Sequence, residues 1–326
     1  MELPTLGIDI SKDTFDIELA LNGKLKHKKL TNGPAGFAAL GAWLAKHQVA
    51  RVHACLEATG TYGEDLALYL VQQGHLVSVV NPARIKAFGQ SELLRNKDDR
   101  VDAGLIRRFC EKQQPPAWQP PAPELRELQA LTRHLENLLV GRQQEENRLQ
   151  AGLKSKAVLK SLRQLVRYFA GEIKRTEKQI QDHLAAHPAL QKQSTLLESI
   201  PGIGQVTAAK LLAESGSFDN YRSARELAAQ AGLTPRNNRS GKLHFRTKLS
   251  KTGNSRLRKA LFMPAMVAKR YNPIVRSFCL RLATHGKNKM QILGAAMRKL
   301  IHIAFGVLKS GNTFNPNHES RRPFTA

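Results

Sequence analysis

LGIDISKDTFDIELALNGKLKHKKL, residues 6–30, decides the fold of the N-terminal part of this chain. Apolar and polar residues alternate along it in three segments, which is typical of β-strands with one buried face. Ser11-Lys12-Asp13 and Asn22-Gly23 separate the segments, and Asn-Gly is a strong signal for a hairpin turn. We therefore predict a β-meander over residues 4–31.

The segments that follow alternate between helix and strand patterns. Helices are predicted over residues 35–47, 63–74 and 98–112, and strands over residues 52–57 and 75–80, the last one ended by Asn81-Pro82. A meander followed by helix, strand, helix and strand indicates an α/β domain with a mixed sheet. This order matches a ribonuclease-H-like fold.

Five prolines between residues 115 and 123 mark a linker. Two apolar seams with helical spacing follow it and predict a pair of long helices. The seams consist of Leu128, Leu131, Leu135 and Leu138, and of Leu159, Leu162, Val166, Phe169, Ile173 and Ile180. The stretch at 151–156 is either a bend or continuous helix. A hairpin of this kind either mediates dimerisation or packs against its own domain.

The last part of the chain is predicted to be mainly helical. LLESIPGIGQVTAAKLLAE, residues 196–214, has the pattern helix, turn, helix, and residues 223–231 form another helix. Residues 232–256 are a basic loop region rich in Gly, Ser and Asn, and residues 257–270 and 289–309 are helices with basic faces. The fold class is therefore α/β followed by α.

The net charge of +25 is divided unevenly along the chain. Residues 194–326 hold 23 Lys and Arg against 5 Asp and Glu, whereas residues 1–110 hold 14 against 12. A basic C-terminal part indicates a polyanion, most simply nucleic acid. Because only 6% of residues are aromatic, base stacking is not expected to dominate binding.

Other compositional features exclude several classes of protein. Cys55, Cys110 and Cys279 are scattered without a CxxC pair, which argues against a disulfide framework and a structural zinc site and fits a reducing cytosol. The N-terminus lacks the pattern of a signal peptide, and no membrane span is expected.

Four acids of the N-terminal part are candidates for a metal site. Asp9 lies in an apolar strand, Glu57 ends another, and Asp99 and Asp102 share one face of a predicted helix. Carboxylates are the ligands that Mg²⁺ prefers, and Mg²⁺ pairs assist phosphoryl transfer. Each acid alone is better explained as a strand-end turn residue or as a helix N-terminal acid favoured by the dipole. Four together, beside a basic partner domain, favour the metal.

Two segments of the basic part are candidates for contact with nucleic acid. Gly202 and Gly204 lie in a helix–hairpin–helix-like turn, where backbone N–H groups can approach a phosphate, although a plain interhelical turn has the same residues. The loop that follows places Ser240 among basic residues that could neutralise a phosphate. Ser250 and Ser255 are nearby competitors, and spacing alone does not select Ser240. The basic residues predicted to bind nucleic acid are Arg236, Arg239, Lys242, Arg246, Lys248, Lys251 and Arg256.

The motifs of the chain occur together in the order of one family. The chain resembles the DEDD transposases of the insertion-sequence one-ten family over nearly its whole length. The motifs that carry the resemblance are GIDISKDTFDI, LEATGTY, LRNKDDRVDA, ESIPGIG, AGLTPRNNRSG and LRKALFMPAMVA.

This resemblance implies a three-part organisation. Residues 1–114 would form a RuvC-like catalytic domain of ribonuclease-H-like fold, residues 115–193 a linker with coiled-coil helices, and residues 194–326 a C-terminal transposase domain. It implies Mg²⁺ held by the matching acids Asp9, Glu57, Asp99 and Asp102. Asp98, directly before Asp99 and four residues from Asp102, is an alternative ligand.

The resemblance also implies a mechanism and partners. Ser240 matches the family's serine nucleophile, which forms a phosphoserine–DNA intermediate. A noncoding bridge RNA would pair with target and donor double-stranded DNA, and the protein would act as a homotetramer, a dimer of dimers, in a prokaryotic cytoplasm at the nucleoid. The active site could be built within one subunit or across two. The competing hypotheses are a RuvC-like junction nuclease that uses water and a non-enzymatic nucleic-acid-binding protein.

Overall fold

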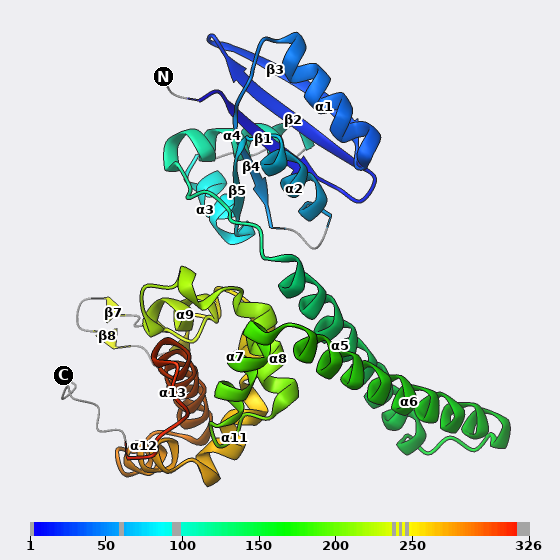
Figure 1. The fold of residues 1–326 in the computed structure, drawn as a ribbon, viewed down its shortest axis with the longest axis vertical. Coiled ribbons are helices and arrows are strands. Elements are labelled where there is room, and N and C mark those ends of the chain that lie inside the picture. The colour runs from blue at the N-terminus through cyan, green and yellow to red at the C-terminus, as the bar shows by residue number, and fades with distance from the viewer. Residues whose placement is uncertain are drawn as a thin grey trace. The chain divides into compact units, whose positions relative to one another are not determined.

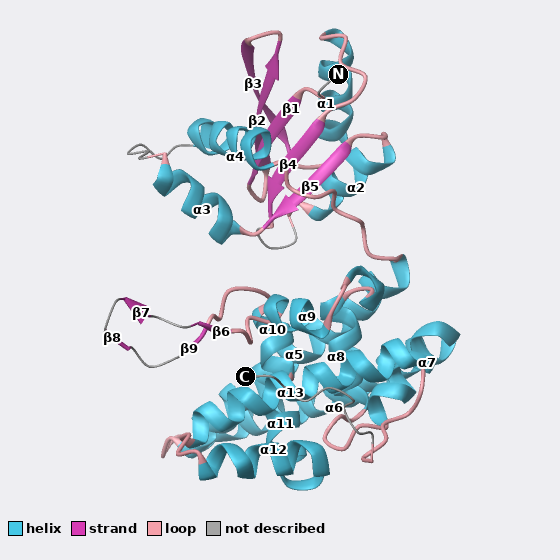
Figure 2. Ribbon diagram, turned by 90° about the vertical axis from the view of Figure 1, so that its left-hand side faces the viewer, coloured by secondary structure: helices cyan, strands magenta, loops and turns pink. Residues whose placement is uncertain are grey.

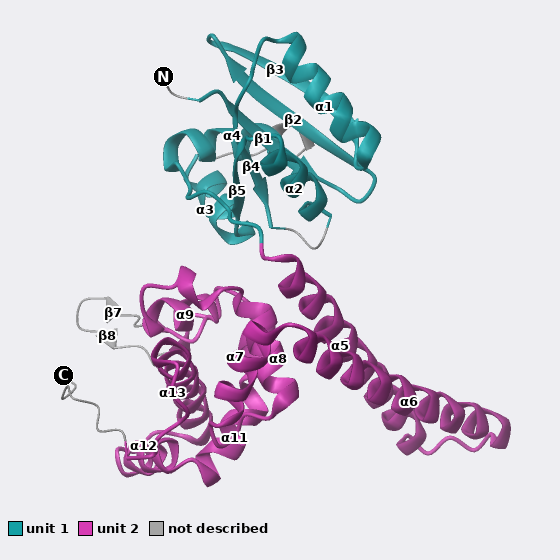
Figure 3. Ribbon diagram, viewed as in Figure 1, with its two compact units in different colours: residues 1–120 teal, residues 121–326 magenta. Residues whose placement is uncertain are grey.

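The structure is a computed structural model that describes residues 3–58, 62–92, 99–236, 239–240, 243–244 and 248–317, with the backbone alone for residues 99–101, 239–240 and 243–244. The chain forms two compact units, Met1–Pro120 and Pro121–Ala326 (Figure 3). Their boundary falls within the proline-rich segment predicted as a linker. The finer division at residues 114 and 193 stays a prediction.

Unit 1 is built on a mixed five-stranded sheet with the strand order β3-β2-β1-β4-β5 (Figure 1). The first three strands form the predicted antiparallel meander, and β1, β4 and β5 are parallel. The strands are β1 Thr5–Ile10, β2 Thr14–Leu21, β3 Lys24–Thr31, β4 His53–Glu57 and β5 Leu76–Val80. The meander turns at Asn22-Gly23, where both residues have a positive φ, 51° and 74°. The mixed sheet predicted from the sequence is confirmed.

Helices cover both faces of this sheet (Figure 2). Helices α1, Pro34–Lys46, and α2, Glu64–Gln72, pack on the face formed by the alternate apolar residues of β1, β2 and β4. Helices α3, Pro82–Ser91, and α4, Asp99–Gln113, cover the other face around Cys55 and Val80. Each strand therefore presents successive side chains to two different helical layers.

Helix α3 was not predicted, because Asn81-Pro82 was interpreted only as the end of a strand. The Asn81 side chain accepts a hydrogen bond from the Ala83 N–H at 2.9 Å, and Pro82 occupies the first helical position. Asparagine at the N-cap followed by proline is a favourable helix start. The same pair ends β5 and begins α3.

Unit 2 begins with the predicted pair of long helices, α5, Pro123–Gln150, and α6, Lys156–Ala186, which pack along each other (Figure 1). The chain bends between them: Gly152 has φ +76°, and Ser155 caps α6 through the Val158 N–H. Several residues of both predicted seams are buried between the helices and the rest of unit 2, namely Leu128, Leu135, Leu138, Leu162, Ile173 and Ile180.

The rest of unit 2 is a helical bundle with short strands in its basic loop region. Its helices are α7 Pro188–Glu198, α8 Gln205–Ser215, the 3₁₀ helix η1 Phe218–Asn220, α9 Ala224–Gln230, α10 Ser255–Ala260, α11 Phe262–Tyr271, α12 Pro273–Thr284 and α13 Lys289–Ser310. Two-residue strands pair as β6 Pro235–Arg236 with β9 Lys248–Leu249, and as β7 Arg239–Ser240 with β8 Leu243–His244. Helix α12, also not predicted, starts like α3, with Asn272 as N-cap and Pro273 at the first position.

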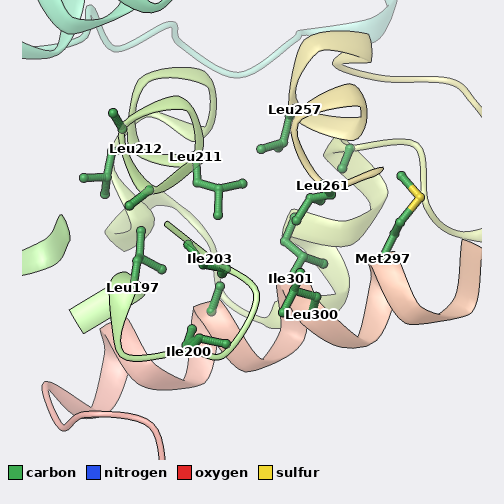
Figure 4. Packing of buried hydrophobic residues seen from close by; sticks show 14 of the residues in the cluster. Leu197, Ile200, Ile203, Leu211, Leu212, Leu257, Leu261, Met297, Leu300 and Ile301 are labelled. Atoms are coloured by element: carbon green, nitrogen blue, oxygen red, sulfur yellow. The ribbon is translucent and has the colours of Figure 1, made fainter. Parts of the chain in front are cut away.

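Helix α13 is the central helix of this bundle. It packs against α7, α9, α11 and α12, and Met297, Leu300 and Ile301 point into the apolar cluster drawn in Figure 4. By length and composition it could cross a membrane, but 44% of its most apolar stretch is buried within the protein. Because the core helix of a globular unit meets the same criterion, α13 gives only weak evidence for a membrane span.

Candidate active site

Asp9 and Glu57 lie at the carboxyl ends of adjacent parallel strands. Ile8 of β1 pairs with Leu56 of β4, so the next residue of each strand is Asp9 and Glu57. Ile8 and Leu56 belong to the core under α1 and α2. Because side chains alternate between faces, Asp9 and Glu57 both belong to the face that α4 covers.

The direction of α4 brings its first turn to the same edge of the sheet. The Cys110 Sγ near the end of α4 lies 4.0 Å from the carbonyl oxygen of His53, the first residue of β4. Asp102 precedes Cys110 by about 12 Å of helix, and Glu57 follows His53 by about 13 Å of strand. The turn that contains Asp99 and Asp102 therefore lies level with the carboxyl ends of β1 and β4.

A glycine sets how closely α4 approaches the sheet. A Cβ atom on Gly7 would lie 2.2 Å from the Ala103 carbonyl oxygen and 2.4 Å from the Arg107 backbone nitrogen. Only a residue without a side chain fits between β1 and α4. Gly7, two residues before Asp9, thus sets the distance between α4 and β1.

A buried ion pair holds α4 against the neighbouring strand β2. The Glu18 carboxylate, in β2 and buried, accepts a hydrogen bond from the Arg107 Nε at 2.7 Å and is 2.7 Å from the His27 Nε2. Arg107 also reaches Glu111 at 2.6 Å. Both partners of the Glu18–Arg107 pair are nearly buried, and such a pair is costly to break because one charge is left without its partner.

The arrangement presents carboxylates at one edge of a sheet, which is the chemistry of a divalent-cation site. Asp9, Glu57 and Asp102 are each partly buried there. Among the described residues, no three His, Cys, Asp or Glu side chains are close enough together to hold a metal ion. The Asp99 side chain and all of Asp98 lie outside the described residues. Which of the two would be a metal ligand therefore stays a prediction from the sequence.

The structure adds one acid that sequence reasoning missed. Asp16 of β2 is the direct antiparallel partner of Asp9, and its carboxylate lies 3.1 Å from the Lys29 Nζ. The register follows from the turn at residues 11–13, and counting across this turn would have found the pair. The Lys29 contact gives Asp16 a structural role next to Asp9.

The glycine-containing turn of unit 2 divides into a packed part and an open part. Gly202 has φ +107°, and a Cβ there would lie 2.9 Å from atoms of Pro264 and Ala268 in α11. Close packing thus accounts for glycine at this position. Ile200 and Ile203 anchor the turn in the apolar cluster (Figure 4). Gly204 is exposed at the N-cap of α8, and no described atom lies within 4 Å of the position that a Cβ atom would occupy there. Of the two glycines, only Gly204 leaves room for a phosphate.

The basic loop is described in part. Arg236 of β6 and Lys248 of β9 are paired and exposed, and Lys251 is exposed with φ +54°. The backbone of Ser240 pairs with Leu243 in a short hairpin. The side chains of Arg239 and Ser240, and all of Lys242 and Arg246, lie outside the described residues.

Arg256 is partly neutralised by an acid of the long helix α5. Its Nη1 lies 3.5 Å from the Glu136 Oε2, and the Lys259 Nζ lies 2.5 Å from the Glu136 Oε1. These three residues and Ser255 line a hollow of about 430 Å³ between α5 and α10. Two cations around one acid leave the hollow positively charged.

Comparisons with known proteins give the family. Residues 6–158 match a family model described as transposase, and residues 194–280 match one described as the transposase IS116/IS110/IS902 family. A pilin gene-inverting protein of Moraxella bovis is 36% identical over 318 residues, which cover 95% of this chain and 97% of that protein. The chain belongs to the IS110 family of transposases. Its substrate class is therefore DNA, and the reaction class is transposition and recombination.

Two further relatives of this IS110-family transposase resemble it along most of their length. A pilin gene-inverting protein of Moraxella lacunata is 35% identical over 95% of this chain. The transposase for insertion sequence element IS1328 of Yersinia enterocolitica is 29% identical and covers 77% of this chain and 82% of its own. The resemblance stated from the sequence motifs is confirmed.

Proposed function

We propose that this transposase cuts and rejoins DNA strands under the guidance of a noncoding bridge RNA. It would use an Mg²⁺ site in unit 1 and the Ser240 hydroxyl as nucleophile. The observation that carries the proposal is the convergence of Asp9, Glu57 and the first turn of α4 at one edge of the sheet.

The sheet supports a RuvC-like assignment of unit 1. Its order, β3-β2-β1-β4-β5 with an antiparallel meander followed by parallel strands, is that of a ribonuclease-H-like domain. Ligand sites of open α/β sheets lie beyond the carboxyl ends of the parallel strands. Asp9 and Glu57 end two such strands.

The chemistry of the donors fits Mg²⁺. Asp9, Glu57, Asp99 and Asp102 would hold it through hard carboxylate oxygens, as Mg²⁺ requires. When bound, the ion would supply positive charge beside the scissile phosphate and favour the deprotonated serine. The Glu18–Arg107 pair and the contact at Gly7 would hold α4, and with it Asp102, at a fixed height above Asp9.

Ser240 would supply covalent catalysis. Its Oγ would form a bond to the scissile phosphorus as one phosphorus–oxygen bond of the DNA breaks, and a base would carry the Oγ proton to the departing DNA oxygen, which leaves as a hydroxyl. A hydroxyl of another DNA strand then attacks the phosphoserine, rejoins the DNA and returns the proton to Ser240. The phosphodiester bond is conserved, so the exchange needs no nucleotide hydrolysis.

The gene-inverting relatives favour rejoining over hydrolysis. Inverting a gene requires that cut strands be joined again, and such a relative is 36% identical over nearly the whole chain. A nuclease that uses water would leave the ends unjoined. The proposed oligomer is a homotetramer, in which the α5–α6 hairpin would contribute contacts between copies.

RNA guidance is tested by the RNA that copurifies with the protein. We expect this RNA, once sequenced, to contain two segments that pair with DNA. Substrates designed from both segments should be exchanged in Mg²⁺, and mismatching either segment should reduce exchange by about 10²-fold or more, since each lost base-pair step costs about 1–2 kcal/mol. Exchange that ignores these mismatches would contradict RNA guidance, and nicked products without joined strands would indicate the hydrolytic nuclease.

A further inference from the structure

Helix α13 carries three basic residues in the middle of its apolar sequence. Arg298, Lys299 and His302 lie within about one turn of each other and are each only partly exposed. Arg298 and His302 are four residues apart and share one side of the helix. Basic groups at the centre of a core helix lose hydration and require compensating partners.

One side-chain nitrogen of Arg298 and one of His302 lack a partner in the described part of the chain. The Nε of Arg298 and the Nε2 of His302 are both inaccessible to water and have no hydrogen-bond partner among the described residues. Helix α9 packs against α13 (Figure 1). It carries a further cation, Arg225, whose charge acts on His302. Within the described residues, the charges that lower the pKa of His302 are the cations Arg298, Lys299 and Arg225.

Burial and neighbouring positive charges lower the pKa of each of these basic groups. Burial, followed by the charges of Arg298, Lys299 and Arg225, lowers the pKa of His302 to about 4. Burial and Arg225 lower the pKa of Arg298. On the other side, burial and Arg281 of α12 lower the pKa of Lys299. Helices α9 and α13 thus bring positive charges together around Arg298 and His302, and an anion would stabilise them.

We propose that Arg225, Arg298 and His302 form a binding site for a phosphodiester group of duplex DNA, in addition to the basic loop around Ser240. The site rests on the proposed function only in taking DNA as the polyanion, and it does not depend on Ser240 or on RNA guidance. Arg298 and His302 lie outside the stretches that match the family models, since α13 begins after residue 280, whereas Arg225 lies within residues 194–280.

Phosphate is the anion that fits this geometry best. Arg225 is exposed, whereas Arg298 and His302 lie deeper, so an entering group would meet the Arg225 guanidinium first. Guanidinium groups bind phosphate through paired N–H donors, and a phosphate offers several acceptor oxygens to converging donors. In a unit this basic, a polyanion from outside the chain matches the charge better than a single carboxylate would.

The test is DNA binding by the full-length protein at a series of salt concentrations. We expect Arg298→Gln and Arg225→Gln each to weaken binding by about tenfold, because each removes a charge-assisted contact. Each should also lower the slope of log K against log salt by about one unit. Arg276→Gln is the matched control: Arg276 is an exposed arginine of α12 whose side chain makes no hydrogen bond or ion pair with the described residues, and its loss should change neither quantity.

A second measurement separates a binding role from a structural one. Thermal unfolding without DNA should show Arg298→Gln at least as stable as wild type, since the change removes an uncompensated cation. In an NMR titration, DNA should raise the pKa of His302 above about 4, because a phosphate offsets the neighbouring positive charges.

The proposal is overturned if Arg298→Gln and Arg225→Gln bind DNA with wild-type affinity and slope. If the wild-type protein binds DNA but exchanges no strands, while both variants bind DNA more weakly, the proposed function is contradicted and this site remains supported.

Discussion

Asp9→Asn and Glu57→Gln are each expected to reduce DNA strand cleavage by about 10³-fold or more. Each substitution replaces a carboxylate by an amide of the same shape at the edge where β1, β4 and α4 converge. A metal site supplies several kcal/mol of transition-state stabilisation, and each 1.36 kcal/mol is a factor of ten in rate. Affinity for DNA should be largely unchanged, because the basic residues that we predict to bind nucleic acid lie in unit 2. Cleavage of a labelled DNA and a separate binding titration measure the two quantities.

Asp65→Asn is the control for loss of one negative charge in the same unit. Asp65 is exposed in the first turn of α2, which packs on the opposite face of the sheet. It should cleave like wild type. If Asp9→Asn cleaves as well as Asp65→Asn does, the metal site is not where we propose it.

Gly7→Ala is expected to destabilise unit 1 by about 3 kcal/mol or more. The added Cβ would lie 2.2 Å from the Ala103 carbonyl oxygen, a backbone atom that can move only if α4 moves. Overpacking of this kind forces backbone shifts, and the contact involves two main chains rather than a flexible side chain. Because α4 carries Asp102, cleavage should fall as well. Denaturant unfolding followed by circular dichroism measures the loss.

Gly33→Ala is the matched control for this substitution. Gly33 is the N-cap of α1 with φ 173°, which any residue adopts, and no described atom lies within 4 Å of its Cβ direction. Replacing glycine at an N-cap by alanine costs well under the effect expected at Gly7. Equal stability of the two variants would contradict the close packing of α4 on β1.

The sheet of unit 1 could be predicted because apolar and polar residues alternate along the strands of its meander. The Asn22-Gly23 turn and the buried runs at residues 52–57 and 75–80 specify strands and their order through local signals. Helices α3 and α12 were missed for one common reason. Both begin with Asn-Pro, which ends the preceding element and also caps the next one.

The candidate site could be predicted as a set of residues but not as a geometry. Asp9 and Glu57 stood out as part of a set of four acids in one α/β domain beside a basic domain. The direction of α4, its contact at Gly7 and the pairing of Asp9 with Asp16 depend on tertiary packing and register. Arg298 and His302 escaped notice because a basic helix face looks solvated in sequence, whereas here it packs against α9.

Covalent capture of DNA tests the central claim most directly. The protein, its copurifying RNA, Mg²⁺ and matched labelled DNA are mixed, denatured and searched by mass spectrometry for a peptide joined to a nucleotide. We predict an adduct on Ser240 that is lost in Ser240→Ala and kept in Ser250→Ala, which removes a serine of the same basic region. An adduct that persists in Ser240→Ala, or joined DNA products formed by this variant, would contradict the account.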